Sequence, residues 1–226
     1  MLIRYAFSIQ GVEKEGVLNQ LKEIISEERR KKMERYRFEA DKIRSLFAEV
    51  LVRYGLKKHF GMEKEEVSIE KNEYGKPELI KRKDIHYNVS HSGDWVICAF
   101  SSFPVGVDVE IEKEHNLDIA KRFFDKTEYE TLRECESPKE LFISYWTLKE
   151  SYVKAEGKGM QIPFDTFSFD IAHDEIKLQV EGKPCNTYEF QVYGIADGVQ
   201  VATCSREPIE GKFKIVSLQD LVETLL

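Results

Sequence analysis

The chain has 226 residues, of which 42% are hydrophobic and 12% aromatic, so it can bury the interior of one large domain or of two halves that share a core. A third of the residues are charged, but the signs are well mixed, which excludes an intrinsically disordered chain. The formal net charge of −7 argues against a general nucleic-acid binder, because such a protein usually carries a basic surface.

Apolar periodicity along the chain predicts a mixture of helices and strands. The clearest feature is a continuous apolar stripe over 41–60, which is typical of a long helix packed on a core. In chain order the predicted elements are a strand at 2–9, a long helix at 41–60, strands at 85–89, 95–100 and 105–110, helices at 117–124 and 126–135, a second long helix at 139–156, and strands at 166–171, 188–193 and 199–204. Gly93-Asp94 and Asp197-Gly198 are predicted hairpin turns.

The two predicted hairpins suggest an internal repeat. The segments HYNVSHSGDWVICAFSSFP and FQVYGIADGVQVATCSREP align without gaps at an offset of 104 residues, and each hairpin follows a long helix. Few residues are identical, so on this pattern alone coincidence explains the alignment as well as duplication does. If the repeat is real, a ligand site is expected between the two halves.

The sequence carries no sign of export or of membrane insertion. The first ten residues lack the long apolar core of a signal peptide, and no stretch reaches the roughly 18 apolar residues that span a bilayer. The four cysteines are scattered, without a C-x-x-C pair or metal-ligand spacing, and are typical of reduced thiols. We therefore expect a cytoplasmic protein without a membrane partner.

The segment 105–110, VGVDVE, places two carboxylates on a predicted strand. Because side chains alternate, Asp108 and Glu110 point to one face, and Val107 and Val109 point to the other. On a solvated face each carboxylate is hydrated separately, which is the usual explanation of a D-x-E pair. Here the flanks are apolar and Gly106 precedes the pair, which indicates a buried strand on which a divalent cation would relieve the repulsion. Magnesium is the leading candidate, since it takes few protein ligands and keeps positions for water and phosphate.

The segment 146–154, WTLKESYVK, carries a second pair of charges. Glu150 and Lys154 are four residues apart, so they share one face of the predicted helix. An ordinary surface ion pair explains this spacing, but the large apolar residues on both sides indicate a helix that is largely buried. A buried glutamate and lysine need partners, and a metal ion together with a phosphate would satisfy both.

Two shorter motifs lie between the long helices. The YGKP turn at 74–77 can present backbone groups and an ammonium to an anion, although such a sequence is often only a turn. In NVSHS, at 88–92, Ser90 and His91 point to opposite faces of a strand, so contact with a phosphate is a better functional interpretation than a nucleophile and its base. Neither a P-loop nor a Rossmann glycine motif is present.

The run 29–37, RRKKMERYR, is strongly basic in an otherwise acidic chain. A solvated helix face explains such a run. A socket for a phosphorylated small molecule explains it too, with Lys42 and Arg44 nearby in the sequence.

Together these motifs resemble the surfactin-type 4′-phosphopantetheinyl transferases. The matching strings, in the order and spacing of that family, are YGKP, NVSHSGDWVICAF, VGVDVE, KRFFDKTEY and WTLKESYVKAEGKG. The resemblance implies an α+β fold of two similar halves in a pseudo-twofold duplication, each a small antiparallel sheet packed on a long helix. It also implies a coenzyme A cleft between the halves. We expect the two halves to consist of residues 1–104 and 105–226.

The resemblance further implies roles for single residues. Asp108, Glu110 and Glu150 would bind Mg²⁺, and Asp108, Glu150 and Lys154 would be catalytic, with Lys154 on the pyrophosphate. The residues implied in binding coenzyme A are Arg29, Lys32, Arg44, Ser45, Tyr74, Gly75, Lys76, Pro77, Ser90, His91 and Lys154. Those at 74–77 would frame the adenine, and those at 29–45 with the pair at 90–91 would surround the 3′-phosphate. Arg29 takes a position that lysine can hold in the family, which keeps the charge but changes the contact geometry.

In the implied reaction the serine hydroxyl of an apo carrier protein attacks the β-phosphate of coenzyme A, and 3′,5′-adenosine bisphosphate leaves. The nucleophile belongs to the carrier, which agrees with the lack of a credible nucleophile in this sequence. Glu150 is the first candidate for the base that removes the serine proton. Glu128 and bound water are the alternatives, because a metal-bound carboxylate is a poor base.

The implied partners are coenzyme A and apo peptidyl or acyl carrier domains, of peptide, polyketide or fatty-acid synthesis. The segment 112–135 mixes cations with aromatic residues, which suits an acidic carrier, although an ordinary helical pair over the core explains it equally well. A monomer is expected, because one chain would supply both walls of the cleft. Two rival functions are another Mg²⁺-dependent enzyme acting on a nucleotide or phosphate ester, and an RNA- or protein-binding module that uses the run 29–37.

Overall fold

A computed structural model of the chain describes residues 1–12, 15–112, 117–172 and 175–226. The first elements are β1 (Ile3–Ser8), α1 (Glu15–Ile24), α2 (Glu27–Glu34), α3 (Glu39–Phe60), η1 (Lys64–Glu66), β2 (Ile69–Lys71), β3 (Pro77–Leu79), β4 (His86–Ser92) and β5 (Trp95–Ser101). They are followed by β6 (Val105–Ile111), α4 (Leu117–Phe123), α5 (Lys126–Glu134), α6 (Pro138–Glu156), η2 (Gly159–Gln161), η3 (Phe164–Thr166), β7 (Phe167–Ala172), β8 (Glu175–Val180), β9 (Lys183–Cys185), β10 (Glu189–Ala196), β11 (Val199–Ser205), β12 (Lys214–Ile215) and α7 (Leu218–Leu225). Both predicted long helices are confirmed, as α3 and α6.

Three antiparallel strands of the four-stranded sheet in the first half have the same topology as the three-stranded sheet of the second half. In the first half β5 lies between β1 and β4, and in the second half β11 lies between β6 and β10. An offset of 104 residues carries β5 onto β11 from end to end, and it brings β4 onto β10 to within one residue. The predicted duplication and α+β class are therefore confirmed, with the hairpin turns at Gly93-Asp94 and Asp197-Gly198.

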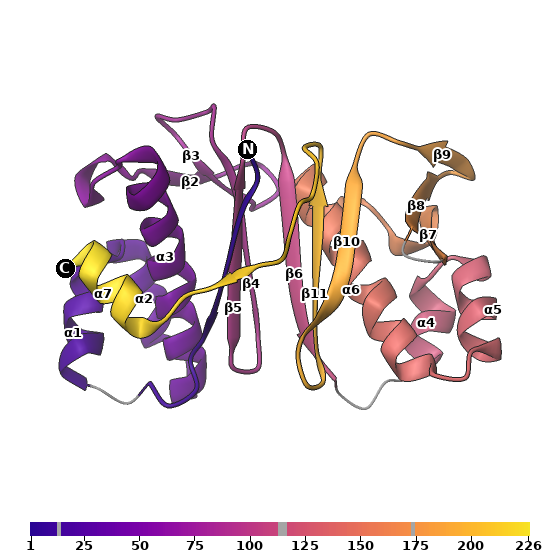
Figure 1. Cartoon of the computed structure of the whole chain (residues 1–226), viewed down its shortest axis with the longest axis horizontal. Helices are drawn as coiled ribbons and strands as arrows, with labels where there is room; N and C mark the ends of the chain where they lie inside the picture. Colours follow the sequence, from indigo (N-terminus) through magenta and orange to yellow (C-terminus); the bar gives the residue numbers. More distant parts are fainter. Residues whose placement is uncertain (13–14, 113–116, 173–174) are drawn as a thin grey trace.

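The elements stack as helix, sheet, sheet and helix (Figure 1). α3 covers the outer face of the first sheet, α6 covers the outer face of the second, and the two sheets pack against each other between the helices. Alternation along the strands separates the apolar side chains into different clusters. On β5, Val96, Cys98 and Phe100 pack on the α3 side, whereas Ile97 and Ala99 join the cluster between the sheets.

β6 and α6 approach each other closely at Gly106. A Cβ atom at this position would lie 1.9 Å from the carbonyl oxygen of Ser151 and 2.5 Å from the backbone nitrogen of Ala155. A side chain at position 106 would therefore separate the strand from the helix. Because side chains alternate on β6, Asp108 and Glu110 share the α6-facing side of the strand with Gly106, as the sequence pattern predicted.

The end of the chain returns to the first half of the fold. β12 pairs in parallel with β1, and α7 packs on α3 and α1 (Figure 1). Arg4 of β1 secures this return, because the residue is 6% exposed and its guanidinium donates to the carbonyl oxygen of Gly211 at 2.7 Å. Residues 214–225 thus pack with the first half. The division near residue 104 otherwise stays a prediction.

No helix in the described ranges has the length and apolar character needed to span a membrane. All four cysteines are free thiols, and Cys98 and Cys204 are buried.

Candidate functional site

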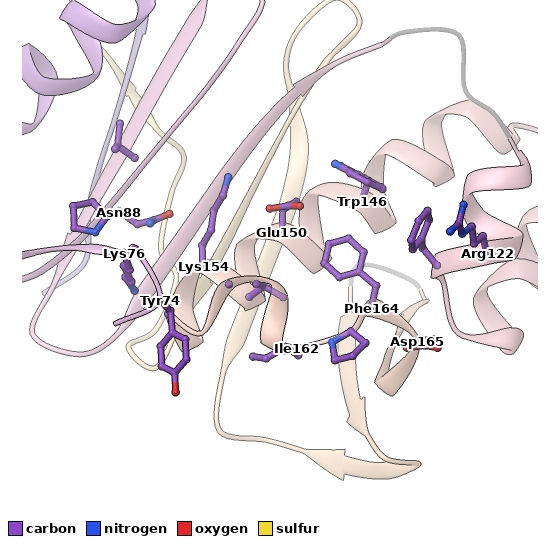
Figure 2. A pocket seen from close by; sticks show the side chains of 18 residues that line it. Tyr74, Lys76, Asn88, Arg122, Trp146, Glu150, Lys154, Ile162, Phe164 and Asp165 are labelled. Carbon is purple, nitrogen blue, oxygen red and sulfur yellow. The ribbon is translucent and has the colours of Figure 1, made fainter. Parts of the chain in front are cut away.

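Two adjoining cavities open between the halves of the fold. The larger, of about 720 Å³, extends from the YGKP turn to an apolar wall that includes Trp146 and Phe164 (Figure 2). The smaller, of about 530 Å³, extends from α2 to β6. The cavities form one cleft, because they share part of their walls: Gly75, Pro77, Asn88, Val89, Trp146, Glu150 and Lys154.

Asp108 on β6 is the buried carboxylate of this cleft. Its side chain is 2% exposed, and its Oδ1 accepts from Ser90 Oγ at 2.8 Å and pairs with Lys154 Nζ at 2.5 Å. Its Oδ2 has no hydrogen-bond partner among the residues that the structure describes. Desolvation raises the pKa of Asp108, and the positive charge of Lys154 opposes that shift. Glu110, on the same face of β6, accepts a hydrogen bond from Ser92 Oγ at 2.8 Å.

Trp146, Glu150 and Lys154 line the cleft at successive turns of α6 (Figure 2). Desolvation raises the pKa of Glu150; Lys154 opposes this shift, while the charges of Asp108 and Glu110 add to it. Desolvation acts to lower the pKa of Lys154, but the three neighbouring carboxylates outweigh it and raise that pKa. In the described part of the chain, Lys154 forms its ion pair with Asp108 of β6. Within the same described ranges, it does not form the surface ion pair with Glu150 that the spacing allows.

A polar stripe on β4, of which only Ser90 was a predicted site residue, holds the carboxylates of β6. Ser90 and Ser92 donate to Asp108 and Glu110, while Asn88 Oδ1 accepts from the backbone nitrogen of residue 107 at 2.9 Å. These three residues alternate along the strand, so they share one face. The pattern N-x-S-x-S is the signal that could have found them.

Three predicted phosphate contacts, Arg29, Lys32 and His91, line the smaller cavity. His91 is exposed at the edge of this cavity. Desolvation by the surrounding protein lowers the pKa of its ring, and the positive charge of Arg44 adds a smaller shift in the same direction. Arg44 itself and Ser45 line neither cavity: Arg44 Nη1 donates to the carbonyl oxygen of Gly93 at 2.8 Å, and Ser45 is buried within α3. Ser90 lies in the cavity wall, but its hydroxyl is already engaged by the Asp108 carboxylate.

The YGKP turn contacts the second half through Lys76. The Lys76 ammonium donates to the carbonyl oxygens of Val105 at 3.3 Å and Ala155 at 3.2 Å, while Asn72 Nδ2 donates to the carbonyl oxygen of Gly157 at 3.1 Å. Tyr74, by contrast, is exposed at the rim of the cleft (Figure 2). Desolvation lowers the pKa of Lys76 to about 8, although nearby acidic groups oppose the shift. The charge of Lys76 is therefore engaged with backbone carbonyls of the second half.

The buried position of Lys76 predicts a specific pH dependence of stability. The unfolded chain keeps the Lys76 proton up to about pH 10.5, whereas the folded chain releases it near pH 8. Between these values the unfolded state binds more protons, so the free energy of unfolding rises with pH. Relative to Lys76→Met, we expect the wild-type protein to gain roughly 3 kcal/mol across this window. Urea unfolding of both proteins at several pH values measures the difference, and a pH-independent difference would contradict a buried ammonium at this site.

Glu128 on α5 does not face the cleft. Its carboxylate and the Lys149 ammonium are both 0% exposed and form an ion pair at 2.8 Å. Lys149 also donates to the carbonyl oxygens of Phe164 and Phe167, each at 2.7 Å. Glu128 lines neither cavity of the cleft, and its enclosed carboxylate disfavours it as the alternative base, which stays a prediction.

The three predicted metal ligands, Asp108, Glu110 and Glu150, lie on facing elements of one cleft. Within the described ranges, no three His, Cys, Asp or Glu side chains are close enough to hold a metal ion as they stand. Their chemistry nonetheless fits a hard divalent cation, because magnesium binds carboxylate oxygens. Asp108 Oδ2 fits this use as well, since it is a buried acceptor without a partner among the described residues.

Two family models match consecutive parts of the chain. Residues 13–102 match the model described as 4′-phosphopantetheinyl transferase, N-terminal, and residues 104–204 match that of the 4′-phosphopantetheinyl transferase superfamily. The boundary between the two matched segments falls between β5 and β6, where the two sheets of the fold meet in sequence.

Curated relatives match over most of their length. The chain is 39% identical to the 4′-phosphopantetheinyl transferase Sfp of Bacillus subtilis, over 81% of this chain and 83% of the relative. It is 36% identical to the 4′-phosphopantetheinyl transferase gsp of Aneurinibacillus migulanus, over 90% and 85%. It is 33% identical to the 4′-phosphopantetheinyl transferase psf-1 of Bacillus pumilus, over 92% and 91%. The chain therefore belongs to the 4′-phosphopantetheinyl transferase family.

Proposed function

We propose that the protein transfers the 4′-phosphopantetheine group of coenzyme A to a serine of an apo carrier protein and releases 3′,5′-adenosine bisphosphate. Family membership supports this activity. The structural observation that carries it is a single cleft with cations from α2 at one end and the carboxylates of β6 and α6 at the other. Such a cleft suits a substrate that carries a phosphate monoester at one point and a reacting pyrophosphate at another.

Coenzyme A would lie along this cleft between the halves. The adenine would be framed by residues 74–77, which line the larger cavity. The 3′-phosphate would contact Arg29, Lys32 and His91, and the pyrophosphate would contact Lys154. Arg44 and Ser45 would act only indirectly, since neither lines the cleft.

The pyrophosphate end would also hold a magnesium ion on Asp108, Glu110 and Glu150. When bound, the ion supplies positive charge that offsets the charge on the pyrophosphate oxygens. Lys154 adds a fixed positive charge there, and Asp108 holds its ammonium in place at 2.5 Å. The Lys154 ammonium has three N–H donors, so one of them must point to the phosphate oxygen while another stays on Asp108.

The carrier serine oxygen forms a bond to the β-phosphorus, and the bond from that phosphorus to the bridging oxygen of the adenosine bisphosphate breaks. The serine proton passes to Glu150, directly or through a water molecule. Glu150 lines both cavities, whereas Glu128 lines neither and is enclosed in its ion pair with Lys149, which favours Glu150. A Glu150→Gln variant that keeps its folded structure and full turnover would rule out this role.

The carrier would dock on the second half, on the predicted platform 112–135, of which residues 113–116 lie outside the described part of the chain. At the end of α4, Phe123 is 46% exposed, and the Arg122 guanidinium lies 5.1 Å from the centre of its ring. Both residues also line the larger cavity. An aromatic and cationic edge beside the reacting end of the cleft suits an acidic carrier surface. We also propose that the enzyme is monomeric and cytoplasmic and has no nucleic-acid partner.

Intact mass spectrometry of an apo peptidyl carrier domain tests the reaction. With coenzyme A and magnesium, we expect the carrier to gain one phosphopantetheine, and we expect a chelator to abolish the gain. With ATP in place of coenzyme A, the carrier mass should not change. If the folded protein modifies neither a peptidyl nor an acyl carrier, yet consumes another phosphate ester, this proposal is wrong. The rival function, another Mg²⁺-dependent enzyme acting on a nucleotide or phosphate ester, would then take its place.

A further inference from the structure

We propose that the buried Glu49 positions Arg29 to bind a phosphate monoester, and that this pair sets the preference of the enzyme for coenzyme A over 3′-dephospho-coenzyme A. The inference rests on the proposed function, because it takes coenzyme A as the substrate of the cleft. It adds a positioning residue that no sequence motif indicates. Glu49 lies in the middle of α3, and its side chain is 3% exposed.

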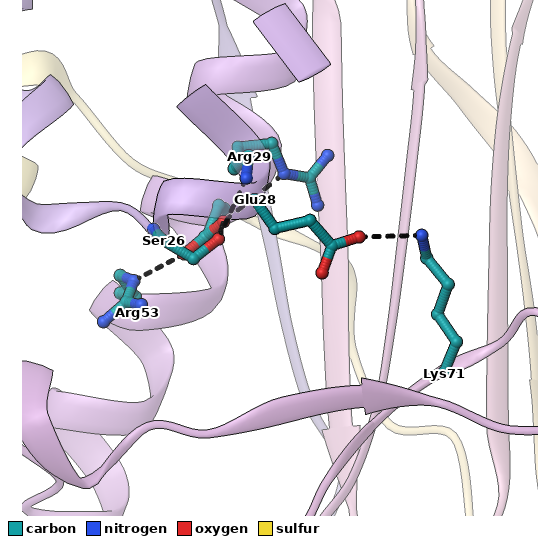
Figure 3. Close-up of polar contacts among 6 residues, drawn as sticks. Ser26, Glu28, Arg29, Arg53 and Lys71 are labelled. Carbon is teal, nitrogen blue, oxygen red and sulfur yellow. Dashed lines mark hydrogen bonds and ion pairs between the residues drawn. The ribbon is translucent and has the colours of Figure 1, made fainter. Parts of the chain in front are cut away.

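The Glu49 carboxylate accepts hydrogen bonds from two elements of the first half (Figure 3). Oε1 accepts from Arg53 Nε at 2.9 Å and from the backbone nitrogen of Ser26 at 2.7 Å. Oε2 accepts from Ser26 Oγ at 2.9 Å and from Arg29 Nε at 3.3 Å. Ser26 is the N-cap of α2 and accepts from the backbone nitrogen of Arg29. One buried carboxylate thus fixes both the start of α2 and the guanidinium of its third residue.

This arrangement leaves the two Nη atoms of Arg29 available to a ligand. Glu49 engages Nε alone, and neither Nη atom has a hydrogen-bond partner among the described residues. Figure 3 shows the Nη end of Arg29 directed away from Ser26 and Arg53. Arg29 lines the smaller cavity together with Lys32 and Lys71, and Lys71 is paired with Glu28 at 2.9 Å. A guanidinium held at Nε presents two donors side by side, which match two oxygens of a phosphate.

The charge pattern of the cavity decides which phosphate binds there. Coenzyme A carries a pyrophosphate and one phosphate monoester. The pyrophosphate must lie where transfer occurs, beside Asp108 and Lys154, so the monoester is the group left for the cationic end. Arginine suits this geometry, because its planar guanidinium keeps two Nη donors in a fixed orientation toward the phosphate while Glu49 holds Nε, and a lysine ammonium has no such fixed fork.

A purely structural Glu49 predicts a different outcome. If it served only to pair with Arg53 and to cap α2, its loss would lower stability and weaken all substrates alike. If it positions Arg29, its loss weakens only ligands that carry the 3′-phosphate. Binding of 3′,5′-adenosine bisphosphate and of AMP separates the two cases without turnover and without a carrier.

We would measure the dissociation constants of both nucleotides, and KM and kcat for coenzyme A and 3′-dephospho-coenzyme A, in wild-type protein and in Glu49→Gln. We expect Glu49→Gln to weaken binding of the bisphosphate about tenfold and to raise KM for coenzyme A similarly, with AMP binding, KM for the dephospho form and kcat little changed. Arg29→Ala should remove the preference, and adding Glu49→Gln to it should change the preference no further. Glu63→Gln, whose exposed carboxylate pairs with Lys57, is the matched control.

Equal losses for both nucleotides in Glu49→Gln, or an unchanged preference, overturn the proposal. If Glu49→Gln does not fold, Arg29→Lys decides, because it keeps the charge on a partly exposed side chain. We expect Arg29→Lys to lower the preference several-fold, and a full preference in that variant overturns the proposal. Failure of the proposed function is distinguishable, since it appears as a wild-type protein that modifies no carrier with either form of coenzyme A.

Discussion

Asp108→Asn is expected to lower kcat/KM for carrier modification by about a thousandfold, which corresponds to about 4 kcal/mol of transition-state stabilisation. The Asp108 side chain is 2% exposed and pairs with Lys154, while its Oδ2 lacks a partner among the described residues. An amide of the same shape removes the negative charge that holds the Lys154 ammonium and the proposed magnesium ion. Initial rates of holo-carrier formation, followed by intact mass, measure the effect.

The matched control for Asp108→Asn is Asp170→Asn. Asp170 is also an aspartate on a strand, but it is exposed on β7 and lines neither cavity of the cleft. We expect this control to keep wild-type rates. Circular dichroism and urea unfolding show whether Asp108→Asn is folded. A folded Asp108→Asn protein with more than about a tenth of the wild-type rate would remove Asp108 from the reaction.

The residues that share one face of β6, and those that share one face of α6, could be read from the sequence because each assignment depends on a local period. The period of two on β6 puts Asp108 and Glu110 on one face, and the period of 3.6 on α6 puts Glu150 and Lys154 on another. Gly106 then marks the side on which the helix approaches the strand. The ion pair across the interface was not predicted, because spacing within α6 favours Glu150 as the partner of Lys154.

The rest of the site depends on contacts between distant segments, which periodicity does not report. Glu49 and Arg29 are 20 residues apart and belong to different helices, so only the packing of α2 on α3 brings them together. Arg44 was assigned to the phosphate from a family motif, yet its guanidinium binds the turn of the β4–β5 hairpin. The return of β12 to β1 joins positions more than 200 residues apart, and a two-residue strand has no sequence signal of its own.

The second large effect is expected on stability, from Glu128→Gln. Glu128 and Lys149 are both 0% exposed, and the variant leaves the Lys149 ammonium buried without its counter-charge. We expect the free energy of unfolding to fall by about 3–5 kcal/mol, because breaking one partner of a buried ion pair leaves an uncompensated charge. Urea unfolding measures the loss. Glu130→Gln, on the same helix but with an exposed carboxylate that pairs with Lys126, should lie within about 0.5 kcal/mol of wild type.

A double variant separates the loss of charge from the loss of packing at this pair. Desolvation raises the pKa of Glu128 and lowers that of Lys149, so each group depends on the charge of its partner. Removing both charges in Glu128→Gln/Lys149→Met should therefore recover much of the stability that either single change loses. The same proteins test the base: if Glu128 took the serine proton, the double variant would recover stability but not turnover. Lys149 directly precedes Glu150 and bonds the carbonyl oxygens of Phe164 and Phe167, so we expect the pair to hold α6 in place and turnover to recover together with stability.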